Sequence, residues 1–288
     1  MKYVLCRPEG GLNDQFNQIA KCLSYARRFG RSLIIDTAIC GFGESHRHYF
    51  VPRDGIIIND AEVIRDVLSA NSHSVFPIAP RQSCFAYRFR YDDAVGNFVT
   101  DPEGLVLSFD FSRDYEEKVL VHHACGGGFD GINALTDFKL ADAIREIFFV
   151  RRRSLPDVYF GLHVRNTDYK TEFEGAFRAI ADNEVFVSRK IPIYLASDDP
   201  SVVSLARKVF PVEVYNFSHL PVVERNLHTT DLLPKPVVNI DALCDLALLS
   251  VANGFFAPKM VQGSYSGFSV LVAQFRERPD ALRAFIGR

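Results

Sequence analysis

The sequence lacks any long apolar segment. No stretch approaches the roughly 20 consecutive apolar residues that a membrane-spanning helix requires, and the start of the chain, Met1 to Arg7, has no signal-peptide hydrophobic region. A C-x-x-C pair is also absent, because the cysteines stand singly. They are Cys6, Cys22, Cys40, Cys84, Cys125 and Cys244. We therefore expect reduced thiols in a cytoplasmic protein without membrane insertion, and neither a disulfide framework nor a zinc site.

Metal-binding histidine motifs and an excess of basic residues are missing as well. The eight histidines show neither H-x-x-x-H nor H-E-x-x-H spacing, so no metal is expected. Lys and Arg number 33 against 35 Asp and Glu, which gives a net charge of −2. A nucleic-acid partner held by phosphate neutralisation needs clustered basic residues. The one basic run, Arg151 to Arg153, is short and typical of a solvated surface.

The 288 residues are enough for about two domains that bury their own cores. Apolar runs alternate with helical patterns, which indicates an α/β protein with mainly parallel sheets. The first repeat is explicit. The pattern predicts a strand at Tyr3–Leu5, a tight turn at Gly10-Gly11, a helix over 14–29 and a second strand over 32–36, which together make a βαβ unit.

Farther along, the middle of the chain (about 40–115) is irregular, and the alternation restarts after it. Further strands are predicted over 105–109, 119–123, 158–164, 193–196, 212–215 and 255–257, and further helices over 134–149, 201–210, 240–252 and 266–276. The charged segment 151–156 ends in proline and is the best candidate for a linker. We therefore predict two Rossmann-like domains that face each other across a cleft, at 1–150 and 151–288.

Ligands of open α/β sheets bind beyond the carboxyl ends of the strands, so the residues that follow each strand are the site candidates. The first set follows the first strand, at Gly10-Gly11-Leu12-Asn13-Asp14-Gln15. Glycines let a backbone approach a ligand closely, and a helix N-terminus offers N–H groups to an anion. A tight turn with Asn13 or Asp14 as the N-cap explains the same residues equally well.

Two further sets follow strands in the second half. His163 and Arg165 lie two apart at the end of 158–164 and project from one face of an extended chain. An arginine there suits bidentate phosphate contact, and Asp168 could orient it or bind a sugar hydroxyl; a surface ion pair is the alternative. After 193–196, Asp199 before Pro200 predicts a helix N-cap, which leaves Asp198 available for a ligand.

Two glycine-containing segments remain. Gly263 to Phe268 opens a helix with small and hydroxyl residues, which suits either a phosphate cradle or simple N-capping by Ser264 or Ser266. Upstream of it, Asp245 is a lone acidic residue among Leu and Ala on a predicted helix. The spacing of Gly126, Gly128 and Gly131 fits G-x-G-x-x-G. It lacks the acidic residue at the end of a following strand, which argues against dinucleotide binding and an NAD-dependent oxidoreductase.

Taken in order, these segments resemble the fucosyltransferases that include the nodulation-factor and N-glycan-core α1,6-enzymes, the α1,2-enzymes and the protein O-fucosyltransferases. Gly10 to Gln15 is similar to their G-G-x-G-N-Q turn, and His163, Arg165 and Asp168 match an H-x-R-x-x-D motif. Ala196 to Pro200 matches an [AT]-[ST]-D-D-P segment. The family also has a motif near the end of the chain, which is approximated here by residues from Asp245 to Ala252 and from Ser264 to Gly267. Residues 37–150 match none of the family's motifs.

The resemblance implies a GT-B glycosyltransferase that inverts configuration, uses GDP-β-L-fucose as donor and needs no metal or other cofactor. It implies that Arg165 holds the diphosphate, that His163 lies on the nucleoside or fucose side, and that Asp245 accepts hydrogen bonds from guanine. The donor site would further include Gly11, Asn13, Asp168, Asp198, Ser264, Ser266, Gly267 and Phe268. The second half would bind the donor and the first half a glycan acceptor that the sequence does not identify, and no oligomeric state is indicated.

An inverting transferase also needs a base that deprotonates the acceptor hydroxyl. Core α1,6-enzymes carry a Glu in a T-E context after their H-x-R-R-T-D run, and Thr171-Glu172 is similar, so Glu172 is the candidate base and Glu174 the reserve. The sequence departs from the pattern at Asn13, where the family has glycine, and at Asn166, where core enzymes have a second arginine. Another GDP-sugar as donor, or a protein that binds sugar or nucleotide without catalysis, is therefore an alternative.

Overall fold

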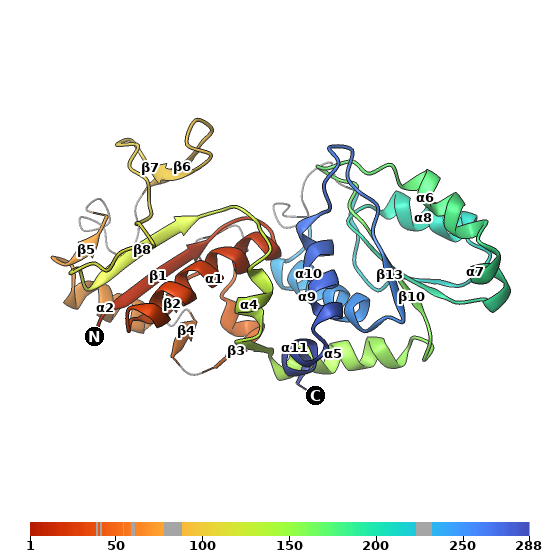
Figure 1. Cartoon of the computed structure of the whole chain (residues 1–288), viewed down its shortest axis with the longest axis horizontal. Helices are drawn as coiled ribbons and strands as arrows, with labels where there is room; N and C mark the ends of the chain where they lie inside the picture. The colour runs from red at the N-terminus through yellow and green to blue at the C-terminus, as the bar shows by residue number, and fades with distance from the viewer. Residues whose placement is uncertain are drawn as a thin grey trace. The chain divides into compact units, whose positions relative to one another are not determined.

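The computed structural model describes residues 1–38, 40, 42–53, 55–58, 61–77, 88–222 and 232–287. Cys84 lies outside them. The chain divides into two compact units, Met1–Ala141 and Asp142–Arg288, which are coloured red to yellow-green and green to blue (Figure 1). Among the described helices, none combines the length and the apolar character needed to cross a membrane.

The first unit is built on a parallel sheet that, in the described part of the chain, has five strands in the order β4-β2-β1-β8-β5. Their bounds are β1 Tyr3–Pro8, β2 Ser32–Ile35, β4 Ile56–Ile58, β5 Val75–Phe76 and β8 Val119–Ala124. Two antiparallel pairs accompany the sheet. They are β3 Phe50–Pro52 with β9 Phe138–Leu140, and β6 Phe89–Asp92 with β7 Asn97–Thr100.

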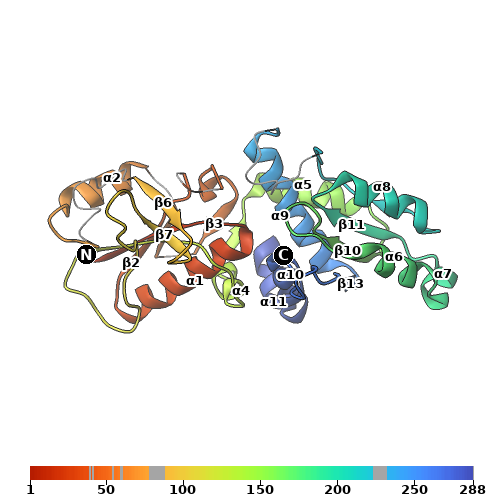
Figure 2. The ribbon, with the colours of Figure 1, turned by 90° about the horizontal axis from the view of Figure 1, so that it is seen from above.

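Helices cover both faces of this sheet (Figure 2). Helix α1 (Leu12–Arg28) packs on one face beside α4 (Gly131–Leu135), and α2 (Ala61–Ala70) covers the other face. A short 3₁₀ helix, η1 (His46–His48), precedes β3. The predicted βαβ start of the chain is confirmed in β1, α1 and β2. Gly10 turns the chain between strand and helix with φ +91, a backbone conformation that side chains rarely adopt.

Two predictions for this unit are wrong. The segment 105–109 contains only an isolated bridge, from Val106 to Val99, in place of a strand. The single helix predicted over 134–149 is divided into α4, β9 and α5 (Asp142–Arg153). The division arises because Phe138 to Leu140 pairs with β3, a partner some 90 residues earlier in the chain that the local apolar pattern does not reveal.

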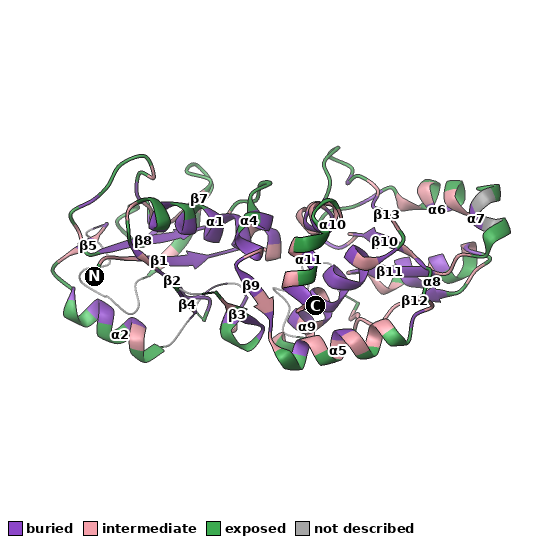
Figure 3. Ribbon diagram, turned by 60° about the horizontal axis from the view of Figure 1, so that its bottom comes forward, coloured by how far each residue is buried: buried purple, intermediate pink, exposed green. Residues whose placement is uncertain are grey.

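The second unit contains another parallel sheet, with the order β12-β11-β10-β13 in the residues that the structure describes. Its strands are β10 Phe160–Val164, β11 Ile193–Ser197, β12 Val214–Tyr215 and β13 Gly254–Phe256. Its helices are α5, α6 Phe173–Ala181, α7 Glu184–Arg189, α8 Pro200–Val209, α9 Lys235–Val251, α10 Gly267–Glu277 and α11 Pro279–Ile286. Most strand positions of both sheets are buried (Figure 3).

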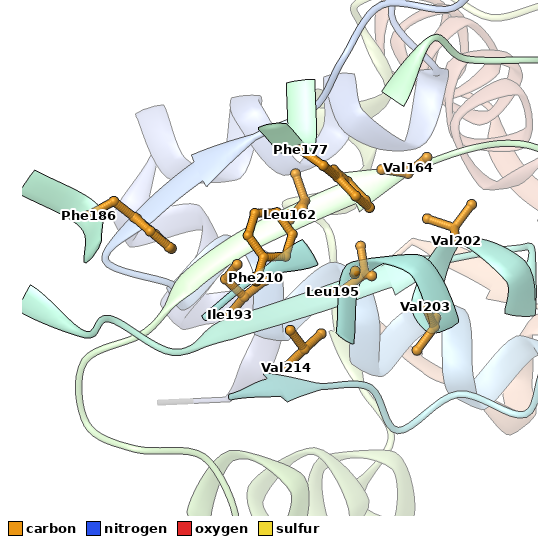
Figure 4. Packing of buried hydrophobic residues seen from close by; sticks show 11 residues of the cluster. Leu162, Val164, Phe177, Phe186, Ile193, Leu195, Val202, Val203, Phe210 and Val214 are labelled. Atoms are coloured by element: carbon orange, nitrogen blue, oxygen red, sulfur yellow. The ribbon is translucent and has the colours of Figure 1, made fainter. Parts of the chain in front are cut away.

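Alternation along β10 and β11 separates two packing layers. Leu162 and Leu195 point into an apolar cluster with Phe177 of α6 and Val202 of α8 (Figure 4). The opposite face packs on α9, and Gly161 of β10 makes this approach close. A Cβ at Gly161 would lie 3.1 Å from both Ala252 Cβ and Leu249 Cδ2.

The predicted linker at 151–156 is wrong in its first half. Arg151, Arg152 and Arg153 form the last turn of α5, and the prediction that this basic run is a solvated surface fails for Arg151. Its side chain is 14% exposed, and its Nη2 lies 2.5 Å from Asp241 Oδ1 on α9. The polar appearance of the run therefore reflects an ion pair that fastens α5 to α9.

Candidate functional site

His163 lies near the carboxyl end of β10, on the face of the sheet that carries α9 and α10. It is buried, and its Nδ1 lies 2.7 Å from the hydroxyl of Ser269 on α10. The ring of Phe268 lies beside the imidazole, with 4.9 Å between centroids. Burial, with a smaller effect of Arg165, lowers the pKa of His163 to about 3, so the imidazole is neutral. A neutral ring can donate one hydrogen bond and accept another, but it cannot neutralise an anion.

Arg165 follows β10 directly and carries the positive charge at this end of the strand. Its Nε and Nη2 bind Asp168 Oδ1 at 3.0 and 2.8 Å, and Nη2 lies 2.8 Å from Asp168 Oδ2. The guanidinium lies over the ring of Tyr169, 5.1 Å from its centroid. The side chain is 24% exposed. Asp168 therefore holds the guanidinium in place, a contact that both the orienting role and the surface ion pair considered from the sequence would give.

The loop that carries Arg165 is held by two aspartates that follow β11. Asp198 accepts hydrogen bonds from the Asn166 N–H and from Thr167 Oγ1, each at 2.7 Å, and its Oδ2 lies 4.0 Å from Arg165 Nε. Burial raises the pKa of Asp198 in spite of these donors. Asp199 Oδ1 accepts from the Ser201 N–H at 2.8 Å, which confirms the predicted N-cap of α8. Asp198 thus positions the Arg165 loop.

The N-terminus of α10 lies beside His163. Ser266 is the N-cap, with its Oγ 3.2 Å from the Ser269 N–H, which settles the choice between the two serines. Gly267 and Phe268 are the first two helical residues. Ser264 is exposed, and its carbonyl oxygen accepts a hydrogen bond from the Met260 N–H at 2.9 Å. The structure therefore gathers three of the predicted segments at one edge of the sheet: the Arg165 loop, Asp198 and the start of α10.

Asp245 occupies a buried position on α9. Its Oδ1 lies 2.5 Å from the Tyr194 hydroxyl of β11 and its Oδ2 lies 2.7 Å from Ser218 Oγ, in the segment after β12. The residue is 6% exposed. Burial raises the pKa of Asp245 to about 6, against the lowering effect of its two hydroxyl donors. The helix position was predictable, but the two hydroxyl partners were not.

The two candidate bases lie at the start of α6. Glu172 is the exposed residue directly before α6, and its side chain does not cap the helix. Glu174 lies 3.7 Å from Arg178 on the same helix, an exposed pair. The preceding Thr171 forms a bridge with Met260, which brings the chain before α10 alongside the Arg165 loop.

Gly11 and Asn13 belong to the first unit, at the carboxyl end of β1. Gly11 is the N-cap of α1, and its N–H donates to Asp14 Oδ2 at 3.1 Å, so the predicted N-cap at Asn13 or Asp14 is wrong. Asn13 is buried, and its Nδ2 donates to the Gly128 carbonyl oxygen at 3.2 Å. The glycines after β8 thus allow close contact with α1: a Cβ at Gly127 would lie 2.6 Å from Asp14 Oδ1.

Several contributing residues escaped the sequence analysis. Ser269 and Thr167 each hold a predicted site residue, and Tyr194 and Ser218 hold Asp245. Only Ser269 left a usable signal, because it stands three positions after the N-cap Ser266, where a polar side chain often completes a helix start. Thr167 stands inside the H-x-R-x-x-D motif but 31 residues from Asp198, and Tyr194 and Ser218 are 51 and 27 residues from Asp245.

A guanidinium and a helix N-terminus at one sheet edge are the groups that bind a phosphate anion. The described residues of this edge offer oxygen, imidazole and guanidinium groups, and the carboxylates of Asp168 and Asp198 are engaged in positioning the loop. The arrangement is therefore suited to an anionic ligand whose charge is met by the protein itself.

The fold is shared with fucosyltransferases of known structure. A structure of the NodZ alpha-1,6-fucosyltransferase soaked with GDP-fucose is 20% identical, with a TM-score of 0.58 over 94% of this chain and 91% of that chain. A fucosyltransferase NodZ from Bradyrhizobium is 20% identical, with a TM-score of 0.60 over 94% of this chain and 92% of that chain. A structure of POFUT1 in complex with GDP-fucose is 14% identical, with a TM-score of 0.52 over 100% of this chain and 95% of that chain. No protein-family model and no curated protein sequence matches the chain.

These similarities define the class at the level of fold: the chain has the α/β fold of fucosyltransferases, as the sequence resemblance implied. The particular structures that it resembles include the NodZ alpha-1,6-fucosyltransferase and POFUT1.

Proposed function

We propose that the chain is an inverting, metal-independent glycosyltransferase of the GT-B type that moves L-fucose from GDP-β-L-fucose to a hydroxyl of a glycan acceptor. The observation that carries the proposal is the position of Arg165. It stands at the carboxyl end of β10 and is oriented by Asp168, and the neighbouring His163 contacts the first turn of α10. Solved structures with this fold contain GDP or GDP-fucose.

The second unit, which follows Ala141, is the proposed donor domain, and the first unit the proposed acceptor domain. In this proposal Arg165 and the N–H groups that open α10, at Gly267 and Phe268, stabilise the negative charge that develops on the departing GDP. His163, neutral and fixed by Ser269, offers its other nitrogen to the nucleotide or the fucose. These groups supply the stabilisation that another enzyme obtains from a divalent cation.

Asp245 is proposed to recognise guanine, since an ionised carboxylate can accept from guanine N1–H and N2–H₂ while it keeps its bonds to Tyr194 and Ser218. Glu172 is proposed as the base that removes the proton of the acceptor hydroxyl, because it is exposed and does not cap its helix, whereas Glu174 is paired with Arg178. Inversion then follows from attack of the deprotonated oxygen on the anomeric carbon as GDP departs from the opposite side.

Ligand-dependent stabilisation tests the donor class. A ligand present at 100 times its dissociation constant stabilises the folded state by about 2.7 kcal/mol. We expect GDP and GDP-fucose to raise the melting temperature and UDP and NAD to leave it unchanged, with equal shifts in EDTA and in Mg²⁺. A shift with NAD alone would instead support the glycine motif at Gly126 to Gly131.

Turnover separates the enzyme from a binding protein. Release of GDP from GDP-fucose, measured with and without a panel of glycan acceptors, is expected for the enzyme. Tight binding of GDP-fucose without release over the whole panel would overturn the catalytic part of the proposal and leave a nucleotide-sugar-binding protein. Release of GDP from GDP-mannose at a higher rate would overturn the assignment of fucose.

A further inference from the structure

Three potential metal ligands converge in the first unit, outside the proposed donor site. Glu9 directly follows β1, His123 is the last residue but one of β8, and Cys40 lies in the segment after β2. The strands are neighbours in the sheet, in the order β2-β1-β8, and parallel strands bring their carboxyl ends to one edge. All three residues are buried, and their ligand atoms lie within 4.8 Å of one another.

We propose that Glu9, Cys40 and His123 form a zinc site that joins the ends of β1, β2 and β8. Thiolate, imidazole and carboxylate are the ligands that Zn²⁺ takes, at about 2.3, 2.0–2.1 and 2.0–2.2 Å, with tetrahedral geometry. Those lengths place neighbouring ligand atoms roughly 3.3–3.8 Å apart. The ligand atoms now lie within 4.8 Å of one another, and His123 Nε2 and Glu9 Oε1 are 3.0 Å apart, so displacements of about 1 Å assemble three of the four positions. A water molecule would complete the tetrahedron.

The imidazole is already aligned for this role. His123 Nε2 and Glu9 Oε1 share a hydrogen bond of 3.0 Å, which holds the two ligand atoms side by side; a metal would take the place of the shared proton. The ring of Phe98 stacks on the imidazole at 5.1 Å and 15°, and the ring of Phe89 meets it edge-on at 4.4 Å. These two rings hold the plane of the imidazole in place.

Charge balance among the described side chains also fits a divalent cation. Arg7 and Asp36 form a buried ion pair at 3.1 Å beside the cluster and neutralise each other. Cys40 Sγ lies 3.4 Å from the Asp36 carbonyl oxygen. Coordination of Zn²⁺ would replace the thiol proton of Cys40, which is released to solvent, and the Glu9 carboxylate and the new thiolate together would match the charge of the metal.

The motif-based prediction missed this cluster because its members are 31 and 83 residues apart in the sequence. Sequence motifs place ligands at short spacings, whereas here the carboxyl ends of three neighbouring parallel strands bring the ligands together. The proposed zinc lies in the first unit and does not depend on the proposed function, whose donor residues Arg165, His163 and Asp245 lie in the second unit.

The test uses the full chain and Co²⁺, which reports thiolate ligation by a near-ultraviolet charge-transfer band. We expect wild-type protein to take up about one Co²⁺ per chain with that band, to lose it when Zn²⁺ is added, and to melt at a higher temperature with Zn²⁺ than after chelation. Cys125→Ser, a change of a half-buried thiol in the same unit, is the matched control and keeps the band.

Cys40→Ser is expected to lose the band and to bind the metal at least roughly 100-fold more weakly than wild type. Glu9→Gln preserves the shape of the side chain, so it tests the same site if Cys40→Ser fails to fold, and it should weaken Co²⁺ binding while the thiolate band remains. Absence of the band in wild-type protein, or its persistence in Cys40→Ser, would overturn the proposal. Calorimetry of metal-free Cys40→Ser with GDP-fucose should still show donor binding, which keeps the two proposals separate.

Discussion

Replacement of Arg165 by alanine is the change with the largest expected effect on donor binding. Two unit charges 4 Å apart interact by about 4 kcal/mol at the effective dielectric constant of about 20 that applies near a protein surface, and the Arg165 side chain is 24% exposed, so this value is appropriate. The variant also takes from the carboxylate of Asp168 the guanidinium that now binds it at 2.8 Å and leaves Thr167 Oγ1 as its donor, so a negative charge near the diphosphate loses its counter-charge. Together these changes predict a loss of about 1,000-fold in affinity for GDP-fucose.

Isothermal titration calorimetry measures the effect directly, and two controls isolate it. Arg178→Ala removes an exposed arginine of the same unit and should leave the affinity unchanged. Arg165→Lys keeps the charge but loses the bidentate fork, so an intermediate affinity is expected. Because the ion pair with Asp168 is partly exposed, Arg165→Ala should cost the free energy of unfolding no more than about 1 kcal/mol. An affinity within threefold of wild type would refute the assignment of the diphosphate to Arg165.

Three further predictions concern the base, the buried aspartate and the packing of β10. Glu172→Gln should lower kcat by about 10²–10⁴-fold with unchanged donor affinity, whereas the kcat of Glu174→Gln should stay near the wild-type value. Equal rates for the two variants in steady-state kinetics would exclude Glu172 as the base. The pKa of Asp245 is raised to about 6, so between pH 4 and 6 the folded state holds this proton while the unfolded state has lost it. The contribution of the protonated carboxyl to the free energy of unfolding is therefore present below pH 4 and is lost as the pH rises through 6. As the pH rises from 4 to 7, the stability of Asp245→Asn relative to wild type should therefore increase, by up to roughly 3 kcal/mol in the free energy of unfolding, and its relative melting temperature should rise. The variant should also lose affinity for GDP-fucose. A difference in melting temperature that does not change with pH would contradict the effect of burial on Asp245. Gly161→Ala should lower the free energy of unfolding by about 1–3 kcal/mol, because its Cβ would lie 3.1 Å from side chains packed on β10. Gly175→Ala on α6, which has open space around it, should be neutral or stabilising by up to about 1 kcal/mol. Urea unfolding measures both changes, and equal effects would show that the contact at Gly161 is not tight.

The regular parts of the fold were predictable from local patterns. Examples are the strand, glycine turn and helix at the start of the chain and the strands that contain His163 and Ala196. Each strand is a buried run followed by a turn or cap signal. The helix starts at Pro200 and Gly267 were predictable for the same reason, since Asp199 and Ser266 cap them. Periodicity and capping are local, so a single sequence reveals them.

Elements that depend on distant partners were not predictable. The strand β9 interrupts what looked like one helix because it pairs with β3, and the basic end of α5 looked like a linker because its partner Asp241 is 90 residues away. The same holds for the polar groups around the site, where Ser218 and Tyr194 satisfy Asp245 from two other elements. Long-range pairing and buried polar contacts leave no local pattern in the chain.

The central claim is that the second unit binds the diphosphate of a guanosine nucleotide sugar through Arg165 and the start of α10. A crystal structure of the chain with GDP tests it most directly. We expect the diphosphate against the Arg165 guanidinium and the N–H groups of Gly267 and Phe268, with guanine at Asp245. Density for GDP at any other place, with no phosphate against the Arg165 guanidinium, would contradict it.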